Sequence, residues 1–149
     1  MTENNGNPHI FRISVAPQKG LKKSNVTEVY IRAGEGIDGD AHGTSHRPVS
    51  LLPFESFQKV YHPDLRINPG DFAENITTWG VDFSGVHIGT RIMLGDSVLL
   101  EVIQIGKKCH HNCIIRETVG DCIMPREGVF AKVLNGGKVK EGDPIRVLH

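Results

Sequence analysis

A net charge, a long apolar run and a nucleotide-binding glycine motif are all missing from this sequence. The 149 residues include 17 basic and 17 acidic side chains, so the formal net charge is zero. Nucleic-acid binders and proteins that dock on anionic membranes usually carry a basic excess, which this chain lacks. No run approaches the roughly 20 apolar residues that a membrane-spanning helix requires. We therefore expect neither nucleic acid nor a membrane as a partner.

Cysteine is scarce as well, and its distribution indicates a reducing compartment. All three cysteines lie between positions 109 and 122, whereas a secreted disulfide framework usually has an even and dispersed set. The N-terminus is polar and lacks the apolar stretch of a secretory signal. We expect a cytoplasmic protein whose thiols serve chemistry or metal binding.

The length suits one domain, and the composition is that of a folded one. Hydrophobic residues make up 38% of the chain and charged residues 23%, which is typical of an ordered globular protein. We expect a flexible N-terminal tail over residues 1–9 and a single domain over residues 10–149.

Short apolar stretches alternate with turn residues along most of the chain. They are rich in Val, Ile and Leu and have the length of strands rather than helices. The predicted strands cover residues 10–15, 26–31, 48–52, 91–94, 98–105 and 145–148. Residues 26–31 have apolar side chains on both faces, which favours a position inside a sheet.

Turn residues and one short periodic segment complete the fold prediction. Gly-Asp pairs favour chain reversals, and the pair within residues 94–97 predicts a hairpin. Only residues 53–60 make a case for a helix, because their apolar side chains recur every three positions. Residues 124–134 fit either a short helix or a strand. The sequence predicts a mostly β, closed or barrel-like single domain with one or two short helices.

Residues 36–47 form the first of three polar clusters, which we call the glycine-rich loop. It combines three glycines and two aspartates with two histidines and Arg47. The backbone N–H groups of such a loop, together with Arg47, can surround an anion. The same residues also fit a solvated loop whose aspartates bond their own backbone. The spacing matches neither a dinucleotide nor a nucleoside-triphosphate motif.

The second cluster, residues 71–78, is less informative. Glu74 and Asn75 can orient a polar ligand, but they equally fit an ordinary turn at the edge of a strand.

The third cluster surrounds Cys109. Lys107 and Lys108 precede this residue and two histidines follow it. Positive neighbours lower the pKa of a thiol and favour the thiolate, which attacks, carries sulfur or binds metal. The alternative for any cysteine is a small buried hydrophobe.

The same segment also admits metal or redox chemistry. Cys109, Cys113, Cys122 and His110 offer sulfur and nitrogen ligands for a tetrahedral zinc ion. They lack the repeated two-residue spacing of zinc ribbons. A redox pair between Cys109 and Cys113 is a further alternative.

Taken together, the three clusters resemble the MOSC domain family, named for the C-terminal domain of molybdenum cofactor sulfurases. The similarity spans about residues 10–148 and depends on the order and spacing of several short motifs. These motifs are Gly39-Asp40-x-His42-Gly43 with Arg47, Val49-Ser50-Leu51-Leu52, Phe72-x-Glu74-Asn75-Ile76-Thr77, Ile88-Gly89, Gly95-Asp96 and Cys109.

The resemblance implies a predominantly β barrel, related to the barrel domain of pyruvate kinase, and a molybdenum cofactor (molybdopterin) as ligand. Cys109 matches the characteristic cysteine of the family and is the implied catalytic residue, on molybdenum or as a sulfur carrier. The cofactor-binding residues implied here are Asp40, His42, Gly43, Arg47, Glu74, Asn75, Lys107 and Lys108.

The resemblance also implies partners. The segment around Cys109 is similar to the small stand-alone bacterial branch of the family, and 149 residues leave no room for a pyridoxal-phosphate cysteine desulfurase domain. A cysteine desulfurase or another sulfur donor is therefore the expected partner, along with molybdoenzymes or cofactor-biosynthesis proteins.

Two alternative functions stay open at this stage. One is a non-catalytic, zinc-stabilised binding module. The other is a molybdenum-dependent reductase of N-hydroxylated compounds, although the accessory N-terminal β-barrel of the larger reductases has no counterpart here.

Overall fold

Strands dominate the computed structural model, which describes residues 7–18, 23–41, 46–60, 63, 66–106 and 127–148. Within these ranges there are ten strands and one short 3₁₀ helix. In chain order they are β1 (His9–Val15), β2 (Ser24–Val26), β3 (Glu28–Ile31), β4 (Val49–Pro53), η1 (Phe54–Val60), β5 (Ile76–Trp79), β6 (Arg91–Leu94), β7 (Val98–Ile105), β8 (Val129–Asn135), β9 (Gly137–Lys140) and β10 (Ile145–Leu148).

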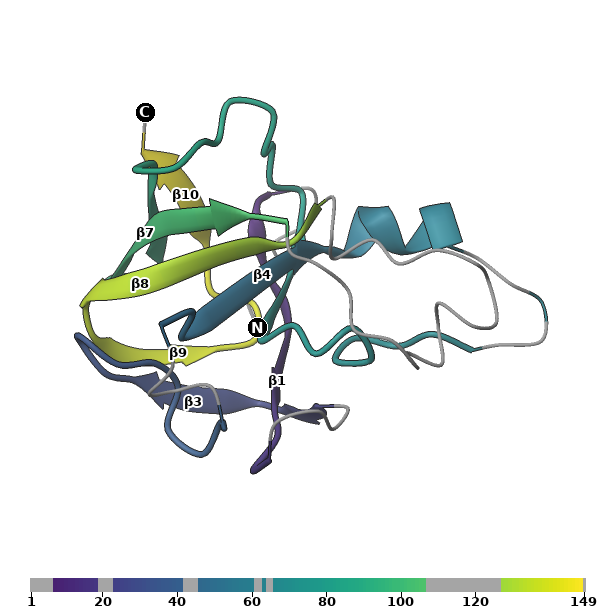
Figure 1. Ribbon diagram of the computed structural model, residues 1–149, viewed down its shortest axis with the longest axis horizontal. Helices are drawn as coiled ribbons and strands as arrows, with labels where there is room; N and C mark the ends of the chain where they lie inside the picture. The colour runs from purple at the N-terminus through teal and green to yellow at the C-terminus, as the bar shows by residue number, and fades with distance from the viewer. Residues whose placement is uncertain are drawn as a thin grey trace.

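Eight of the strands form one sheet, and the other two form a small second sheet. The order in the large sheet is β10-β6-β7-β8-β4-β5-β1-β2, and β3 pairs with β9. Figure 1 shows β7, β8 and β4 side by side, with the β3–β9 pair below them in this view. The pairing of β4 with β5 is parallel and the other strand pairs are antiparallel. The prediction of a mostly β fold is confirmed.

The large sheet curls until its two ends approach each other, but it does not close into a continuous ladder. Strands β10 and β2 stand at the ends of the strand order. Near the start of β10, the N–H of Ile10 donates to the Asp143 carbonyl at 2.9 Å, and the N–H of Ile145 donates to the Pro8 carbonyl at 3.1 Å. These bonds bring the start of β1 against the start of β10, so the sheet is barrel-like and open.

Branched aliphatic side chains fill the inside of the curled sheet. Each fully buried Ile, Leu or Val contributes about 1.5–3 kcal/mol relative to an exposed position. The largest fully buried ones are Ile10, Ile13, Ile31, Ile37, Leu51, Leu52, Ile76, Ile92, Leu94 and Leu100.

Three predicted strands are confirmed residue for residue: Arg91–Leu94, Val98–Ile105 and Ile145–Leu148. The predicted hairpin is confirmed too, because Leu94 pairs with Val98 and the chain reverses between them.

The segment 26–31 differs from the prediction. It is divided between β2, which pairs with β1, and β3, which pairs with β9. Both are end strands of their sheets, so the expected interior position is wrong. Glu28 and Tyr30 on β3 are exposed, and the carbonyl of Thr27 between the two strands accepts a hydrogen bond from Glu141.

The predicted helix is confirmed as the 3₁₀ helix η1, which begins one residue later than expected because Pro53 ends β4. Its aromatic side chains pack as expected. The ring centroids of Phe54 and Phe57 lie 5.2 Å apart, and Phe57 meets Phe72 edge-on at 5.1 Å. Within the segment 124–134, which fits either a short helix or a strand, residues 129–134 belong to the strand β8.

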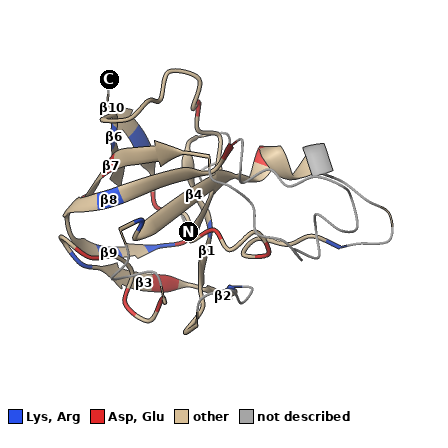
Figure 2. Cartoon of the chain, viewed as in Figure 1, with Lys and Arg blue, Asp and Glu red and all other residues tan. Residues whose placement is uncertain are grey.

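Charged residues of both signs are interspersed along the chain (Figure 2). Exposed pairs such as Lys138 with Glu28, at 3.0 Å, contribute little to stability, about 0–1 kcal/mol each. In the described part of the chain, no helix is long and apolar enough to cross a membrane.

Candidate functional site

The glycine-rich loop is anchored to the sheet through the carboxylate of Asp40. Gly39, just before it, has a φ of +85°, a left-handed conformation that glycine adopts without a steric penalty. The Asp40 side chain is fully buried, and its Oδ1 accepts hydrogen bonds from Lys23 Nζ at 2.6 Å and from the Ala16 N–H at 3.0 Å. The Ala41 N–H donates to the Ala16 carbonyl at 2.7 Å. The loop is thus attached just past the end of β1.

Lys23 and Asp40 form a buried ion pair, with 2% and 0% of their side chains exposed. Burial lowers the pKa of Lys23, while the hydrogen bond and attraction from Asp40 and the attraction of Glu74 oppose this. Burial alone would raise the pKa of Asp40, but the hydrogen bonds from Lys23 and Ala16 hold that pKa below its usual value. The two charges therefore depend on each other, and removing either one strands the other in the interior.

Glu74 lies in the same interior, with none of its surface exposed. Its Oε2 accepts hydrogen bonds from the Gly70 N–H at 3.0 Å and from the Thr77 hydroxyl at 2.7 Å. Its Oε1 has no hydrogen-bond partner among the described residues. Burial raises the pKa of Glu74 to about 7, although the hydrogen bonds from Gly70 and Thr77 oppose the shift. This carboxyl group therefore exchanges its proton near neutral pH.

Asn75 connects the loop to two strands. Its Oδ1 accepts hydrogen bonds from the N–H of Ser50 on β4 at 3.0 Å and from the Ser50 hydroxyl at 3.2 Å. Its Nδ2 donates to the carbonyl of Ser14 on β1 at 3.2 Å, and the side chain also hydrogen-bonds Asp40. One amide group thus fixes β1, β4 and the glycine-rich loop relative to one another.

Sequence-predicted residues from two separate clusters therefore meet in one buried network, which contains Asp40, Glu74 and Asn75. Their side chains are used inside the protein, so in this structure they support the loop rather than line an open surface. Their assignment to cofactor binding stays a prediction.

Arg47 lies at the other end of the glycine-rich loop. Its guanidinium carbon is 5.4 Å from the ring centroid of Phe130, and the residue is half-buried. Phe130 is the second residue of β8 and pairs in register with Ser50 on β4. Arg47 therefore lies against β8, the neighbour of the strand β4 that Asn75 bonds through Ser50.

The described residues on either side of the cysteines are hydrogen-bonded to each other between the end of β7 and the start of β8. We call residues 107–126 the cysteine segment. The Gly106 N–H, at the end of β7, donates to the Gly128 carbonyl before β8 at 2.6 Å. The Ser56 hydroxyl on η1 donates to the Glu127 carboxylate. The cysteine segment thus leaves the sheet and rejoins it at adjacent points, next to Phe130.

Several predicted site residues lie outside the described residues. They are His42, Gly43, Lys107, Lys108, Cys109, His110, Cys113 and Cys122. No group of three or more His, Cys, Asp or Glu residues that could hold a metal occurs in the part of the chain the structure describes. The predicted zinc ligands are not in that part, so the zinc alternative stays a prediction.

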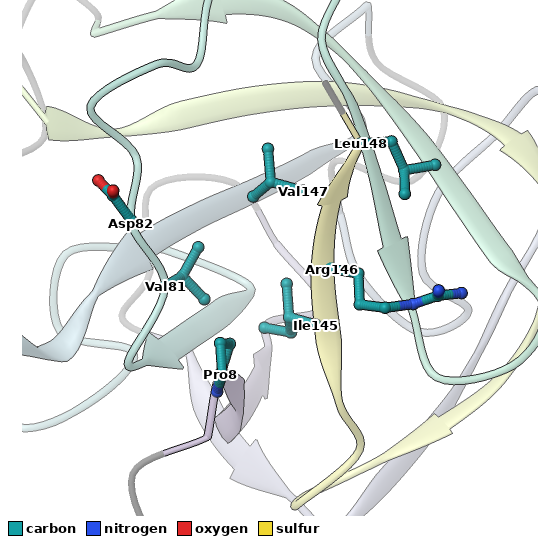
Figure 3. Close-up of a pocket in the computed structure, with 7 residues that line it drawn as sticks. All are labelled: Pro8, Val81, Asp82, Ile145, Arg146, Val147 and Leu148. Carbon is teal, nitrogen blue, oxygen red and sulfur yellow. The ribbon is translucent and has the colours of Figure 1, made fainter.

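A groove of about 450 Å³ lies elsewhere, along the edge strand β10. Its lining residues are Pro8, Val81, Asp82 and Ile145–Leu148. Figure 3 shows Val81, Ile145 and Val147 gathered on one side of β10, whereas Arg146 points to the other side. An apolar groove without a convergent cation does not suit an anionic ligand, and it contains none of the predicted site residues.

Sequence reasoning missed Lys23, Ser14, Ser50 and Thr77 as members of the network. Lys23 follows another lysine in a polar stretch, and such a stretch usually indicates a solvated turn. Its partner Asp40 is 17 positions away, so no local spacing marks the pair. Ser50 is a polar residue within the apolar motif Val-Ser-Leu-Leu of a predicted strand. That position could have indicated a buried polar group.

The fold and the network define a small, mostly β domain in which a glycine-rich loop is anchored on a curled sheet. A family model described as the MOSC domain matches residues 38–146. The chain therefore belongs to the MOSC domain family, which is associated with the C-terminal domain of molybdenum cofactor sulfurases.

Solved structures with the same fold include those of three bacterial proteins. The YuaD protein from Bacillus subtilis is similar with a TM-score of 0.77 and 18% identity, over 94% of each chain. YiiM from Geobacillus stearothermophilus has a TM-score of 0.71 and 20% identity, over 95% of this chain and 75% of that one. YiiM from Escherichia coli has a TM-score of 0.64 and 22% identity, over 93% of this chain and 70% of that one. No curated protein matches the chain.

Proposed function

We propose that the protein handles the molybdenum cofactor, binding its anionic pterin part beside the glycine-rich loop and using Cys109 to hold molybdenum or to carry sulfur. Family membership supports the ligand class. The observation that carries the proposal is the meeting of two segments at the start of β8. Arg47 lies over Phe130, and the cysteine segment rejoins the sheet at Gly128.

The charges of the network fit an anionic ligand. The glycine-rich loop contains two aspartates, which would repel a phosphate if both were exposed and unpaired. Asp40 is buried and neutralised by Lys23, and Asp38 is paired with Arg32 at 2.5 Å. Glu74, outside the loop, carries a proton on part of the molecules near pH 7. Among the described residues of this loop, Arg47 carries the positive charge that suits a phosphate. Its guanidinium group can donate two parallel hydrogen bonds to phosphate oxygens.

Residues of the cysteine segment would complete the site. Cys109 is three positions after Gly106, so the chain keeps their Cα atoms within about 11 Å of each other. Lys107 and Lys108 would add positive charge beside the thiolate, and His42 and Gly43 would contribute from the loop. The bound cofactor supplies a molybdenum ion that accepts a soft thiolate ligand.

Sulfur transfer would use the same thiolate. Cys109 would attack the outer sulfur of a persulfide on a partner such as a cysteine desulfurase, and the partner's thiolate would leave. The sulfur then bound to Cys109 as a persulfide is available for delivery. The neighbouring lysines favour this chemistry because they keep the attacking group ionised.

Substitution of Arg47 tests the binding part of the proposal. Arg47→Gln should weaken pterin binding by roughly tenfold to a hundredfold, because a hydrogen bond to a charged group contributes about 1.5–3 kcal/mol. The measurement is the pterin content of protein purified from cells that make the cofactor. Arg146→Gln, on the exposed face of β10, is the matched control and should retain the pterin. Equal pterin content in both variants, or none in the wild type, would contradict the proposal.

A further inference from the structure

We infer that Lys23, Asp40 and Glu74 form a proton-controlled anchor for the glycine-rich loop. A proton on Glu74 keeps the loop seated on the end of β1, and loss of that proton weakens the seat. The anchor is argued from contacts within the chain and requires no ligand. Its effect on ligand affinity rests on the proposed function of the loop.

One cation serves two buried carboxyl groups. Lys23 bonds Asp40 directly and is also attracted by Glu74. With Glu74 protonated, the cluster holds one positive and one negative charge and is neutral. With Glu74 ionised, it holds an excess negative charge in the interior, and a buried charge without a partner is unfavourable.

The hydrogen bonds to ionised Glu74 leave one of its oxygens unsatisfied. Gly70 and Thr77 both donate to Oε2, and the backbone N–H groups of Phe72 and Glu74 also favour the ionised form, but Oε1 has no hydrogen-bond partner among the described residues. An ionised carboxylate has about four acceptor positions, so it draws on the nearest available donor. The ammonium of Lys23, which has three donors, is the described cation that attracts it. Ionised Glu74 therefore competes with Asp40 for Lys23.

Weakening the bond between Lys23 and Asp40 acts directly on the glycine-rich loop. Asp40 is the loop residue that Lys23 and Ala16 hold, and the adjacent Ala41 N–H bonds the Ala16 carbonyl. The described charged group that interacts with Glu74 is Lys23, from the segment before β2, and Lys23 in turn holds Asp40 of the loop.

The direction of the pH dependence follows from proton linkage. With the loop seated, Glu74 retains its proton up to about pH 7. We expect release of the loop and of Lys23 to hydrate the carboxyl group, which then ionises near its ordinary value of 4.5. Between these values, release of the loop liberates a proton and becomes about tenfold more favourable per pH unit. Above pH 7 the effect levels off. If the loop binds the pterin as proposed, ligand affinity declines over the same interval.

Amide hydrogen exchange measured by NMR on the ligand-free chain tests the anchor. The Ala16 and Ala41 amides should lose protection, after correction for intrinsic exchange rates, by up to roughly tenfold per unit between pH 5 and 7. In Glu74→Gln, which stays neutral, their protection should be independent of pH. Glu55→Gln is the matched control, since Glu55 is an exposed carboxylate that accepts the Gly80 N–H at 2.7 Å, and it should behave like the wild type.

Two results would overturn the inference. One is constant protection of Ala16 and Ala41 across this pH interval in the wild type. The other is a free energy of opening for Ala16 and Ala41 that equals, at every pH, that of the Val102 amide, whose hydrogen bond to the Thr90 carbonyl lies far from the loop in sequence. Equal values would mean that these amides open only by global unfolding, on which Glu74 also acts, and that the loop is not released on its own. Because no ligand is present, neither result depends on whether the protein binds a pterin.

Discussion

A single ammonium group, that of Lys23, interacts with two buried carboxyl groups and determines the charge of the network. It pairs with Asp40 at 2.6 Å and attracts Glu74. Proteins rarely bury charges without partners, because the desolvation penalty of each ion amounts to several kcal/mol. The position of the glycine-rich loop therefore depends on Lys23, a residue that the sequence does not assign to the site.

Lys23→Met should destabilise the protein by about 3–5 kcal/mol, because it leaves the Asp40 carboxylate buried without its cation. The double variant Lys23→Met/Asp40→Leu should recover a large part of that loss, since it removes both charges. Urea unfolding of both variants measures this. Lys138→Met, at an exposed pair with Glu28, serves as the control and should change stability by less than about 1 kcal/mol. A double variant as unstable as the single one would show that the pair interaction is not the cause.

Glu74 gives the protein a stability that depends on pH. The ordinary pKa of its carboxyl group is 4.5, and in the folded protein it is about 7. The folded state thus binds more protons between these values, so the stability that Glu74 contributes is full below pH 4.5 and is lost as the pH rises to 7. The total loss is about 3 kcal/mol. Urea unfolding at a series of pH values should show this decline in the wild type relative to Glu74→Gln. Parallel curves for the two proteins would contradict the assignment.

At the scale of secondary-structure elements, Asn75 joins three of them. It bonds Ser50 on β4 and Ser14 on β1, and it directly precedes β5. These strands come from distant parts of the chain, so their hydrogen-bonded link sets how the glycine-rich loop meets the sheet.

Asn75→Ala should destabilise the protein by about 3 kcal/mol, because it leaves buried donors and acceptors on Ser50 and Ser14 without partners. The matched control is Asn135→Ala, an exposed position where the side chain donates to the Ser97 carbonyl at 2.5 Å. That variant should lose about 1 kcal/mol or less. Thermal unfolding of both variants decides the matter, and equal losses would refute the special role of Asn75.

The elements that the sequence predicts well are those with a clear local pattern. Strands β6, β7 and β10 are apolar runs next to Gly-Asp turns, and each is found where expected. Strand β5 was missed because the polar residues before it, Glu74 and Asn75 among them, assign residues 71–78 to a polar cluster; its two threonines are buried in the structure. Asp40, Glu74 and Asn75 stand out in the sequence, but as members of two separate clusters. Their convergence depends on Lys23 and Ser50, and no local sequence pattern carries information on such long-range contacts.

At the scale of the whole molecule, the curled sheet brings together segments that the chain separates. Strand β8 pairs with both β4 and β7; Arg47 at the end of the glycine-rich loop lies against it, and Gly106 and Gly128, on either side of the cysteine segment, are hydrogen-bonded at its start.

The molybdenum content of the purified protein tests the central proposal most directly. Protein from cells that make the cofactor should contain molybdenum and pterin in equal amounts, and Cys109→Ala should lose most of the molybdenum. Cys122→Ala should retain it, which separates a molybdenum ligand from a general effect of losing a thiol. Stoichiometric zinc without molybdenum, lost from both variants, would contradict the account and favour the zinc-stabilised module.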